Sequence, residues 1–254
     1  MADTVQICFD TYQTSVPSLL DRIGTARLVA DEQCILIKPN LVNDSPFPVT
    51  TAPTFCREVV RWLQARTRGK IIIAEGCGDA KLETDQVFHN LGYDRMAQDL
   101  GVDLLDLNHA ELVRLKRPEN RIFPEFFLPK IAIDAFILSL PVLKAHSFAR
   151  ITGTLKNMMG FAPPKHYAGS GYWKKAAFHE NMHQSLQELN TYILPDLTLM
   201  DASVGLSQYH LGGPTCTPPA NRLIAGIDPF GVDRAAAKLI GLDPDTIAHL
   251  QPLV

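Results

Sequence analysis

The sequence lacks any block of basic residues. Its 254 residues include 24 lysines and arginines against 27 aspartates and glutamates, for a formal net charge of −3. A nucleic-acid-binding surface needs clustered cations that neutralise phosphates, and attraction to an anionic membrane surface needs a similar basic block. We therefore expect neither nucleic acid nor a membrane as a partner.

Long apolar runs and paired cysteines are also missing. The longest apolar run, from Ala135 to Leu143, is far shorter than the roughly 20 residues that a membrane-spanning helix needs. The beginning of the chain has no long apolar segment either, so we expect a cytoplasmic protein. The five cysteines are an odd number and form no Cys-x-x-Cys pair, which argues against a disulfide framework and a ferredoxin-type iron–sulfur cluster.

What the sequence does contain is an alternation of apolar runs with segments of helical periodicity. Runs rich in Ile, Val and Leu predict strands at 5–9, 34–41, 70–74, 135–143, 197–200 and 222–227. The spacing of apolar residues predicts helices near 16–23, after Pro53, around 182–193 and at 231–240. Short apolar runs separated by prolines indicate a small β-rich insertion around 102–133. The pattern predicts a single α/β domain over 1–254, with a mainly parallel or mixed sheet flanked by helices.

Five of the apolar runs end in an ionisable residue or are followed directly by one: Lys38, Glu75, Lys144, Asp201 and Asp228. In an open parallel sheet the ligand crevice lies outside the carboxyl ends of the strands. We therefore expect these groups to converge on one site. The plainer alternative is that each charge marks the point where a buried strand reaches solvent.

Glycine, proline and asparagine are common in the turns near these groups. Lys38-Pro39-Asn40, Glu75-Gly76-Cys77-Gly78 and Gly212-Gly213-Pro214 allow the backbone to approach a ligand closely. None of them is a Gly-x-Gly-x-x-Gly or phosphate-loop pattern, so dinucleotide and ATP binding lack their usual signal.

The densest group of reactive side chains lies in residues 144–160, directly after the run at 135–143. It includes Lys144, His146, Thr152, Lys156 and Asn157. If the threonines open a helix, its free backbone N–H groups, together with the lysines, would hold a carboxylate or a phosphate. A capped helix with Lys156 in solvent would explain the same residues without a ligand. A buried lysine would also serve as a base or a Schiff-base nucleophile, and these roles stay open at the level of sequence.

His179-Glu180-Asn181-Met182-His183 matches H-E-x-x-H, in which two imidazoles one helical turn apart bind zinc and the glutamate acts as a general base. The longer zinc-protease pattern fails, because Leu186 and Leu189 stand where a glycine and a third histidine are needed. A third ligand would have to be Asp196, Asp201, His210 or a residue from earlier in the chain. A metal-dependent hydrolase is therefore a weaker alternative to a structural or acid–base role for these histidines.

In their order, several of these motifs resemble the family known as domain of unknown function 362. The resemblance rests on Ile37-Lys38-Pro39-Asn40-Leu41, Leu140-Pro141-Val142-Leu143-Lys144-Ala145-His146, Thr152 with Lys156-Asn157-Met158-Met159-Gly160, His183, Asp201, Gly213-Pro214, and Asp228-Pro229 with Asp233. Some members carry ferredoxin-like iron–sulfur segments, but this chain has no cluster-binding cysteines, and the family name implies no reaction. Only His183 of the H-E-x-x-H motif matches the family pattern, so the resemblance implies that the motif is a coincidence.

The leading hypothesis is a cytosolic enzyme that binds an anionic metabolite at the carboxyl ends of the strands and transfers a proton. Its catalytic residues would be Lys144, His146 and His183, and its ligand-binding residues Lys38, Asn40, Glu75, Thr152, Lys156, Asn157 and Gly213. Asp201 and Asp228 would orient those groups or hold a divalent metal. The alternative is a non-catalytic ligand-binding or accessory protein that works with a separate redox partner.

Overall fold

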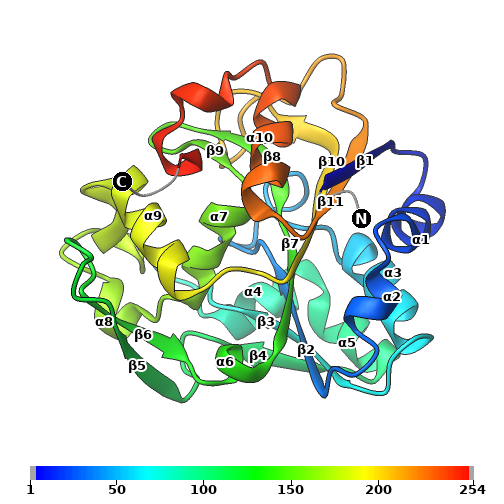
Figure 1. The fold of residues 1–254 in the computed structure, drawn as a ribbon, viewed down its shortest axis with the longest axis horizontal. Helices are drawn as coiled ribbons and strands as arrows, with labels where there is room; N and C mark the ends of the chain where they lie inside the picture. The colour runs from blue at the N-terminus through cyan, green and yellow to red at the C-terminus, as the bar shows by residue number, and fades with distance from the viewer. Residues whose placement is uncertain (1–3, 252–254) are drawn as a thin grey trace.

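The computed structural model describes residues 4–251, whose strands form two sheets (Figure 1). The strands of the larger sheet are β1 (Thr4–Cys8), β2 (Cys34–Pro39), β3 (Lys70–Glu75), β4 (Asp103–Asp106), β7 (Phe136–Leu140), β8 (Val142–His146), β9 (Arg150–Thr152), β10 (Leu197–Leu206) and β11 (Arg222–Gly226). Their order is β1-β11-β10-β7-β2-β3-β4, with β8 pairing with β10 and β9 with β8. β5 (Leu112–Lys116) and β6 (Glu125–Pro129) form a separate antiparallel hairpin.

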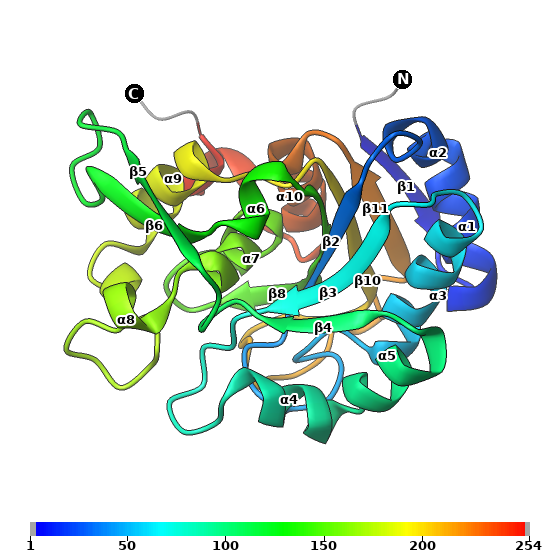
Figure 2. The same ribbon diagram turned by 90° about the horizontal axis from the view of Figure 1, so that it is seen from below.

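The larger sheet is mixed, as the sequence predicted. β4, β3, β2, β7 and β10 run parallel, whereas β11 is antiparallel to both β10 and β1, and β9 is antiparallel to β8. The β-rich region around 102–133 is divided between the two sheets. β4 extends the main sheet beside β3, and only the β5–β6 hairpin stands apart as an arm at its side (Figure 2).

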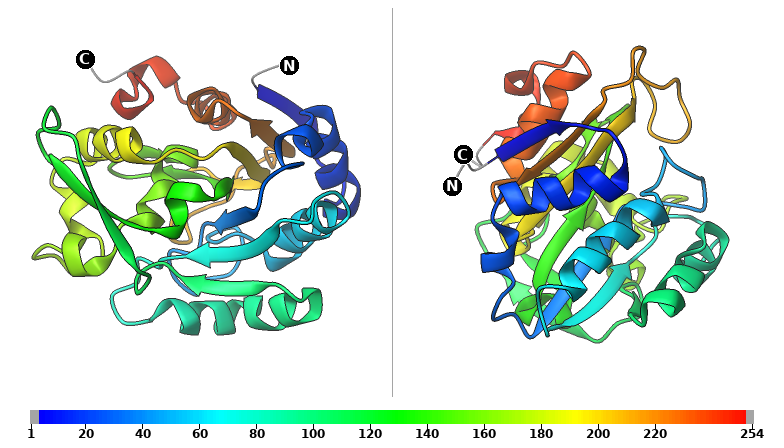
Figure 3. Two further views of the ribbon diagram at one scale, coloured as in Figure 1. Left: turned by 60° about the horizontal axis from the view of Figure 1, so that its bottom comes forward. Right: turned by 90° about the vertical axis from the view of Figure 1, so that its right-hand side faces the viewer.

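Helices cover both faces of the main sheet (Figure 3). One face packs against α1 (Tyr12–Arg22), α3 (Pro53–Gln64), α4 (Thr84–Leu91) and α5 (Tyr93–Leu100). The other packs against α7 (Thr154–Asn157), α9 (Met182–Tyr192), α10 (Pro229–Leu239) and the 3₁₀ helices η1 (Met158–Phe161) and η2 (Ala176–His179). Shorter helices are α2 (Thr25–Leu28), α6 (Ile131–Asp134), α8 (Pro164–Tyr167), η3 (Pro244–Thr246) and η4 (Ala248–Leu250). In residues 4–251 no helix is long and apolar enough to cross a membrane.

The two helical layers explain why the strands read as continuous apolar runs. In β2, Ile35 and Ile37 pack in the core beneath α1 and α3, whereas Leu36 packs in the core beneath α9. Successive side chains of a strand point to opposite faces, so a strand covered on both sides needs apolar residues at every position. Each such side chain, once fully buried, stabilises the fold by about 1.5–3 kcal/mol.

Candidate functional site

Two charged strand ends meet because β2 and β3 are parallel neighbours. Lys38 Nζ lies 2.7 Å from the carboxylate of Glu75, and the two side chains are 1% and 3% exposed. The same carboxylate accepts backbone hydrogen bonds from Leu41 (2.9 Å) and Gly76 (2.8 Å). Burial lowers the pKa of Lys38, and the neighbouring Glu75 opposes that shift. This ion pair has all of its polar atoms engaged.

Two asparagines extend the pair into a larger network. Asn157 Oδ1 accepts hydrogen bonds from Lys38 (3.3 Å) and from Asn40 Nδ2 (3.1 Å). Asn40 Oδ1 in turn accepts a hydrogen bond from Lys144 (2.6 Å), whose Nζ also donates to the carbonyl of Val49 (2.5 Å). Burial and the charge of Lys156 lower the pKa of Lys144 to about 7. Lys38, Glu75, Asn157, Asn40 and Lys144 are called the strand-end network below.

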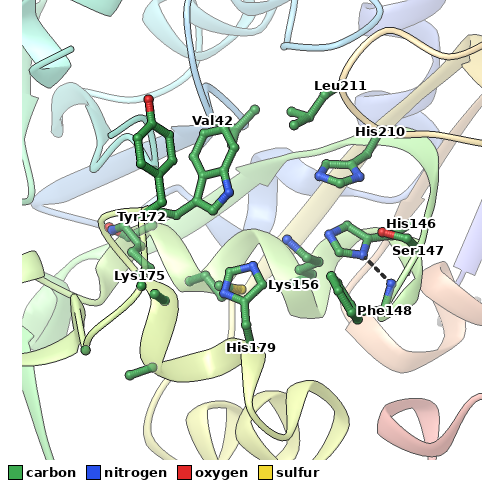
Figure 4. A pocket seen from close by; sticks show the side chains of 18 of the residues that line it. Val42, His146, Ser147, Phe148, Lys156, Tyr172, Lys175, His179, His210 and Leu211 are labelled. Carbon is green, nitrogen blue, oxygen red and sulfur yellow. Dashed lines mark hydrogen bonds between the residues drawn. The ribbon is translucent and has the colours of Figure 1, made fainter. Parts of the chain in front are cut away.

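A cavity of about 520 Å³ lies beside the strand-end network, and Asn40, Glu75 and Asn157 form part of its lining. The lining also includes Lys156 of α7 and three histidines from separate segments, His146 at the end of β8, His179 of η2 and His210 of the loop after β10, together with Lys175 and Glu180. Figure 4 shows Lys156 between His179 on one side and His146 with His210 on the other.

Lys156 differs from the lysines of the strand-end network. No hydrogen-bond or ion-pair partner within residues 4–251 reaches its Nζ, and burial lowers its pKa to about 8. The helix that carries it, α7, begins at Thr154, but its N–H groups are not free for a ligand. Asp233 of α10 accepts from the backbone N–H of Thr154 (2.6 Å) and Leu155 (3.0 Å). The expected anion site at this helix N-terminus is therefore occupied by the protein's own carboxylate.

His146 has a defined tautomer. Its Nδ1 accepts hydrogen bonds from the backbone N–H of Phe148 and of Ala149, both 3.1 Å long. Because Nδ1 serves as the acceptor, the neutral ring carries its proton on Nε2. The ring stacks on His210 with the centroids 3.9 Å apart. Burial, followed by the charge of Lys156, lowers the pKa of His146.

His179 and His210 present nitrogens without partners. Nδ1 of each ring is buried and has no hydrogen-bond partner in the described part of the chain. Burial, aided by Lys156, lowers the pKa of His210 to about 3, and the same two causes lower that of His179. Near neutral pH these rings are uncharged. At the level of sequence, His210 was only a possible third ligand of the H-E-x-x-H motif, and no motif assigns it to this cavity.

Lys175 is a further buried lysine that the sequence analysis missed. Its Nζ donates to the carbonyls of Gly160 (3.1 Å) and Ala162 (2.8 Å) and to Asn108 Oδ1 (3.1 Å). Burial lowers its pKa to about 7, against the opposing effect of Glu75. These bonds attach the segment 169–176, which lines the cavity, to the backbone at η1.

His183 lies elsewhere, and the H-E-x-x-H motif is not on one helix. His179 ends η2, whereas α9 begins at Met182, so the two histidines belong to separate helices. Nδ1 of His183 lies 3.0 Å from Nδ1 of His249 in η4. The zinc motif needs both imidazoles on one face of a continuous helix. His179 and His183 do not share one helix, so they do not form the zinc-binding motif on which the metal-dependent hydrolase was based.

The two aspartates predicted as metal ligands do not join the strand-end network. Asp201 is buried in the middle of β10, where it accepts hydrogen bonds from the Tyr12 hydroxyl (2.6 Å) and the N–H of Ser203 (2.9 Å), and burial raises its pKa. Asp228 caps α10 by accepting from the N–H of Phe230. Because β11 runs antiparallel to β10, it ends at the opposite edge of the sheet from the carboxyl ends of the parallel strands. Asp228, which follows β11, therefore lies at that opposite edge.

The remaining predicted residues, Thr152 and Gly213, lie in β9 and in the loop after β10. Thr152 is buried in β9, opposite Lys144 in register. Gly213 closes a turn with Tyr209, and an added Cβ would lie 2.7 Å from the Cβ of that tyrosine. The turn therefore holds the segment that carries His210.

Groups of three metal-ligating side chains are scarce. Among residues 4–251, the one set within reach of a single ion is Glu83, Asp106 and His109, which lies at the surface rather than in the cavity. The five cysteines are free and are not gathered into a ligand group within that range. The described residues therefore do not fit an iron–sulfur cluster.

Fold and site together define an α/β protein with a cavity at the carboxyl ends of its parallel strands, lined in part by a lysine and three histidines. A family model described as "Domain of unknown function (DUF362)" matches residues 35–238, and the chain belongs to this family. No curated protein is similar enough in sequence to count as a match.

Two solved structures share the fold. One is the lactate racemase apoprotein from Thermoanaerobacterium thermosaccharolyticum, at 15% identity and a TM-score of 0.50 over 92% of this chain and 56% of that one. The other is a protein from Thermotoga maritima, at 12% identity and a TM-score of 0.52 over 93% of this chain and 59% of that one. This chain thus spans little more than half the length of either structure.

Proposed function

We propose that this protein is an enzyme that binds a small organic anion in the cavity and exchanges protons with it through His146, His179 and His210. One observation carries the proposal: the ammonium group of Lys156 borders the cavity without a partner in residues 4–251. Lys156 is half-buried, and a partly desolvated cation without a counter-charge costs free energy. A carboxylate or phosphate on the ligand would supply that partner through a charge-assisted hydrogen bond.

The proton transfer rests on the state of the three imidazoles. His146 presents Nε2–H as a donor, because both backbone hydrogen bonds fall on its Nδ1. His179 and His210 are neutral near pH 7, because burial and Lys156 lower the pKa of each, and each has an unengaged Nδ1. A bound anion would partly cancel the charge of Lys156 and raise these pKa values towards the range in which general acid–base catalysis is efficient.

The choice of first ligands follows from the fold. The lactate racemase with the same fold acts, by its name, on a small hydroxy acid. Lactate, 2-oxoglutarate and inorganic phosphate therefore make a first set of probes, which separates carboxylates from phosphate.

Binding is tested by calorimetric titration of the wild type, of Lys156→Met, and of Lys116→Met as a control. Lys116 is an exposed lysine of β5 outside the cavity. We expect at least one probe to bind the wild type and the control, and Lys156→Met to lose that binding. Binding that is equal in all three proteins would contradict the anion site.

Catalysis is tested by incubating the bound probe in deuterium oxide and following its C–H signals by NMR. Loss of signal in the wild type, and its retention with His146→Gln, would support proton transfer. Binding that depends on Lys156 without any exchange would instead identify a non-catalytic ligand-binding protein.

A further inference from the structure

The mouth of the cavity is lined by exposed aromatic side chains. Phe148, Tyr172 and Tyr209 are 61%, 67% and 46% exposed, and all three border the cavity. They come from three separate segments: the β8–β9 turn, the 169–176 segment and the loop after β10. The other large apolar side chains exposed in residues 4–251 are Ile133, Leu194 and Ile227, which are aliphatic and lie outside the cavity lining. Phe148, Tyr172 and Tyr209 are called the aromatic rim below.

The aromatic rim is continuous with the histidines inside. The Phe148 ring meets His179 edge to face, with the centroids 6.2 Å apart and an angle of 88°. Tyr209 meets His210 in the same manner at 4.9 Å. Figure 4 shows Phe148 and Tyr172, with Val42 and Leu211, around Lys156. An apolar group entering the cavity would therefore touch the rim while its other end reached the lysine.

The size of the cavity also points to a ligand larger than a simple anion. A volume of about 520 Å³ falls within the roughly 300–1,000 Å³ typical of sites for drug-sized molecules. A three-carbon hydroxy acid or an inorganic phosphate would leave most of that space unfilled. Exposed apolar surface gathered around a polar centre is characteristic of a ligand-binding groove.

From these observations we infer that the ligand is amphipathic: an anionic group that binds Lys156 is joined to an aromatic ring or comparable apolar body that packs against the aromatic rim. The inference rests on the proposed function for its anionic end. The occupant is a small molecule rather than a protein surface, because two of the rim rings are held against the cavity's imidazoles instead of forming a flat outer patch.

The test compares acetate, phenylacetate and the neutral phenylacetamide by calorimetric titration. Each ring–ring contact contributes about two- to tenfold in affinity. We expect phenylacetate to bind at least about tenfold more tightly than acetate. Phe148→Ser and Tyr209→Ser should each weaken phenylacetate binding by about three- to tenfold and leave acetate binding unchanged. Ile133→Ser, at an exposed apolar position outside the cavity, is the matched control and should change neither.

Each outcome separates this inference from the proposed function. Equal affinities for acetate and phenylacetate, both lost in Lys156→Met, would overturn the amphipathic ligand and leave the anion site standing. Phenylacetamide binding as tightly as phenylacetate, with no effect of Lys156→Met, would support the rim and overturn the anion site. Self-association in sedimentation that Phe148→Ser abolishes, without phenylacetate binding, would assign the rim to a second copy of the chain and overturn the inference.

Discussion

The strand-end network and the cavity wall place lysines of the same sheet edge in opposite circumstances. Lys38 and Lys144 each have two or more oxygen partners from the protein within hydrogen-bonding distance. Lys156 has none among the described residues and faces a cavity instead. Burial lowers the pKa of all three, so burial alone does not distinguish structural from functional lysines. The lysines differ instead in whether the ammonium group already has oxygen partners from the protein or leaves that role to a ligand.

Removing a lysine from the strand-end network should have the largest effect. Lys38→Met leaves the carboxylate of Glu75 buried without its counter-ion, and breaking a buried pair from one side typically costs about 3–5 kcal/mol of unfolding free energy. Urea denaturation measures the loss. The matched control is Lys70→Met, because Lys70 and Asp103 form a pair of equal length, 2.7 Å, between β3 and β4, but in solvent. Equal losses in the two variants would refute the structural assignment of Lys38.

Adding a methyl group at Gly160, which packs against the same ion pair, should have the next largest effect. An added Cβ at Gly160 would lie 2.3 Å from Glu75 Oε1 and 2.4 Å from Lys38 Nζ. Since the pair has no space to withdraw, Gly160→Ala should destabilise the protein by about 1–3 kcal/mol, as overpacking does. At Gly78 the nearest atom to an added Cβ is 3.5 Å away, so Gly78→Ala serves as the control. The melting temperature of each variant gives the comparison, and an unchanged value for Gly160→Ala would disprove the close packing.

The smallest and most diagnostic effect is the pH dependence of stability in Lys156→Met. The pKa of Lys156 is about 8 in the folded protein, against about 10.4 in an unfolded chain. Between these values the unfolded state holds more protons, so Lys156 makes the wild-type protein gain stability as the pH rises. Below about pH 8 Lys156 is protonated in both the folded and the unfolded state, and its full destabilising effect on the folded protein is present. The methionine variant should therefore be the more stable protein at about pH 7, with an advantage that shrinks by about pH 9.5.

Urea titrations of the wild type and Lys156→Met at the two pH values test this expectation. Lys116→Met, which alters an exposed lysine of β5, should show the same difference from the wild type at both. A difference for Lys156→Met that does not vary with pH would mean that Lys156 ionises as it does in water.

Much of the fold follows from the sequence because buried parallel strands leave continuous apolar runs. β2, β3 and β11 fall within two residues of the predicted ranges, whereas β10 was predicted only to residue 200 and continues to Leu206. α4 and α5 were missed, because each is short and buries only three of its residues. Gly92, with a φ of +79°, separates them and further shortens the periodic pattern. The run at 135–143 covers two strands, because β8 begins directly after Pro141.

The residues of the site that the sequence pointed to either follow strands or lie in the dense group at 144–160. Lys38, Glu75 and Lys144 meet because β2, β3 and β8 end at the same edge, and adjacency in the sequence pointed to Lys156 and Asn157. His210 and Lys175 lie in long connections, whose path over the sheet edge the sequence does not encode in a recognisable pattern. Asp228 was assigned to this edge because the direction of β11 could not be read from its composition.

The pairing of β1 with β11 has a consequence for synthesis on the ribosome. Cys8 of β1 pairs with Arg222 of β11, so more than 200 residues must be added before the first strand finds its partner. At roughly 5–20 residues per second, this interval is on the order of ten to forty seconds. During that time the hydrogen-bonding edge of β1 is exposed to other chains, which makes it the segment where nascent-chain chaperones would have most to protect.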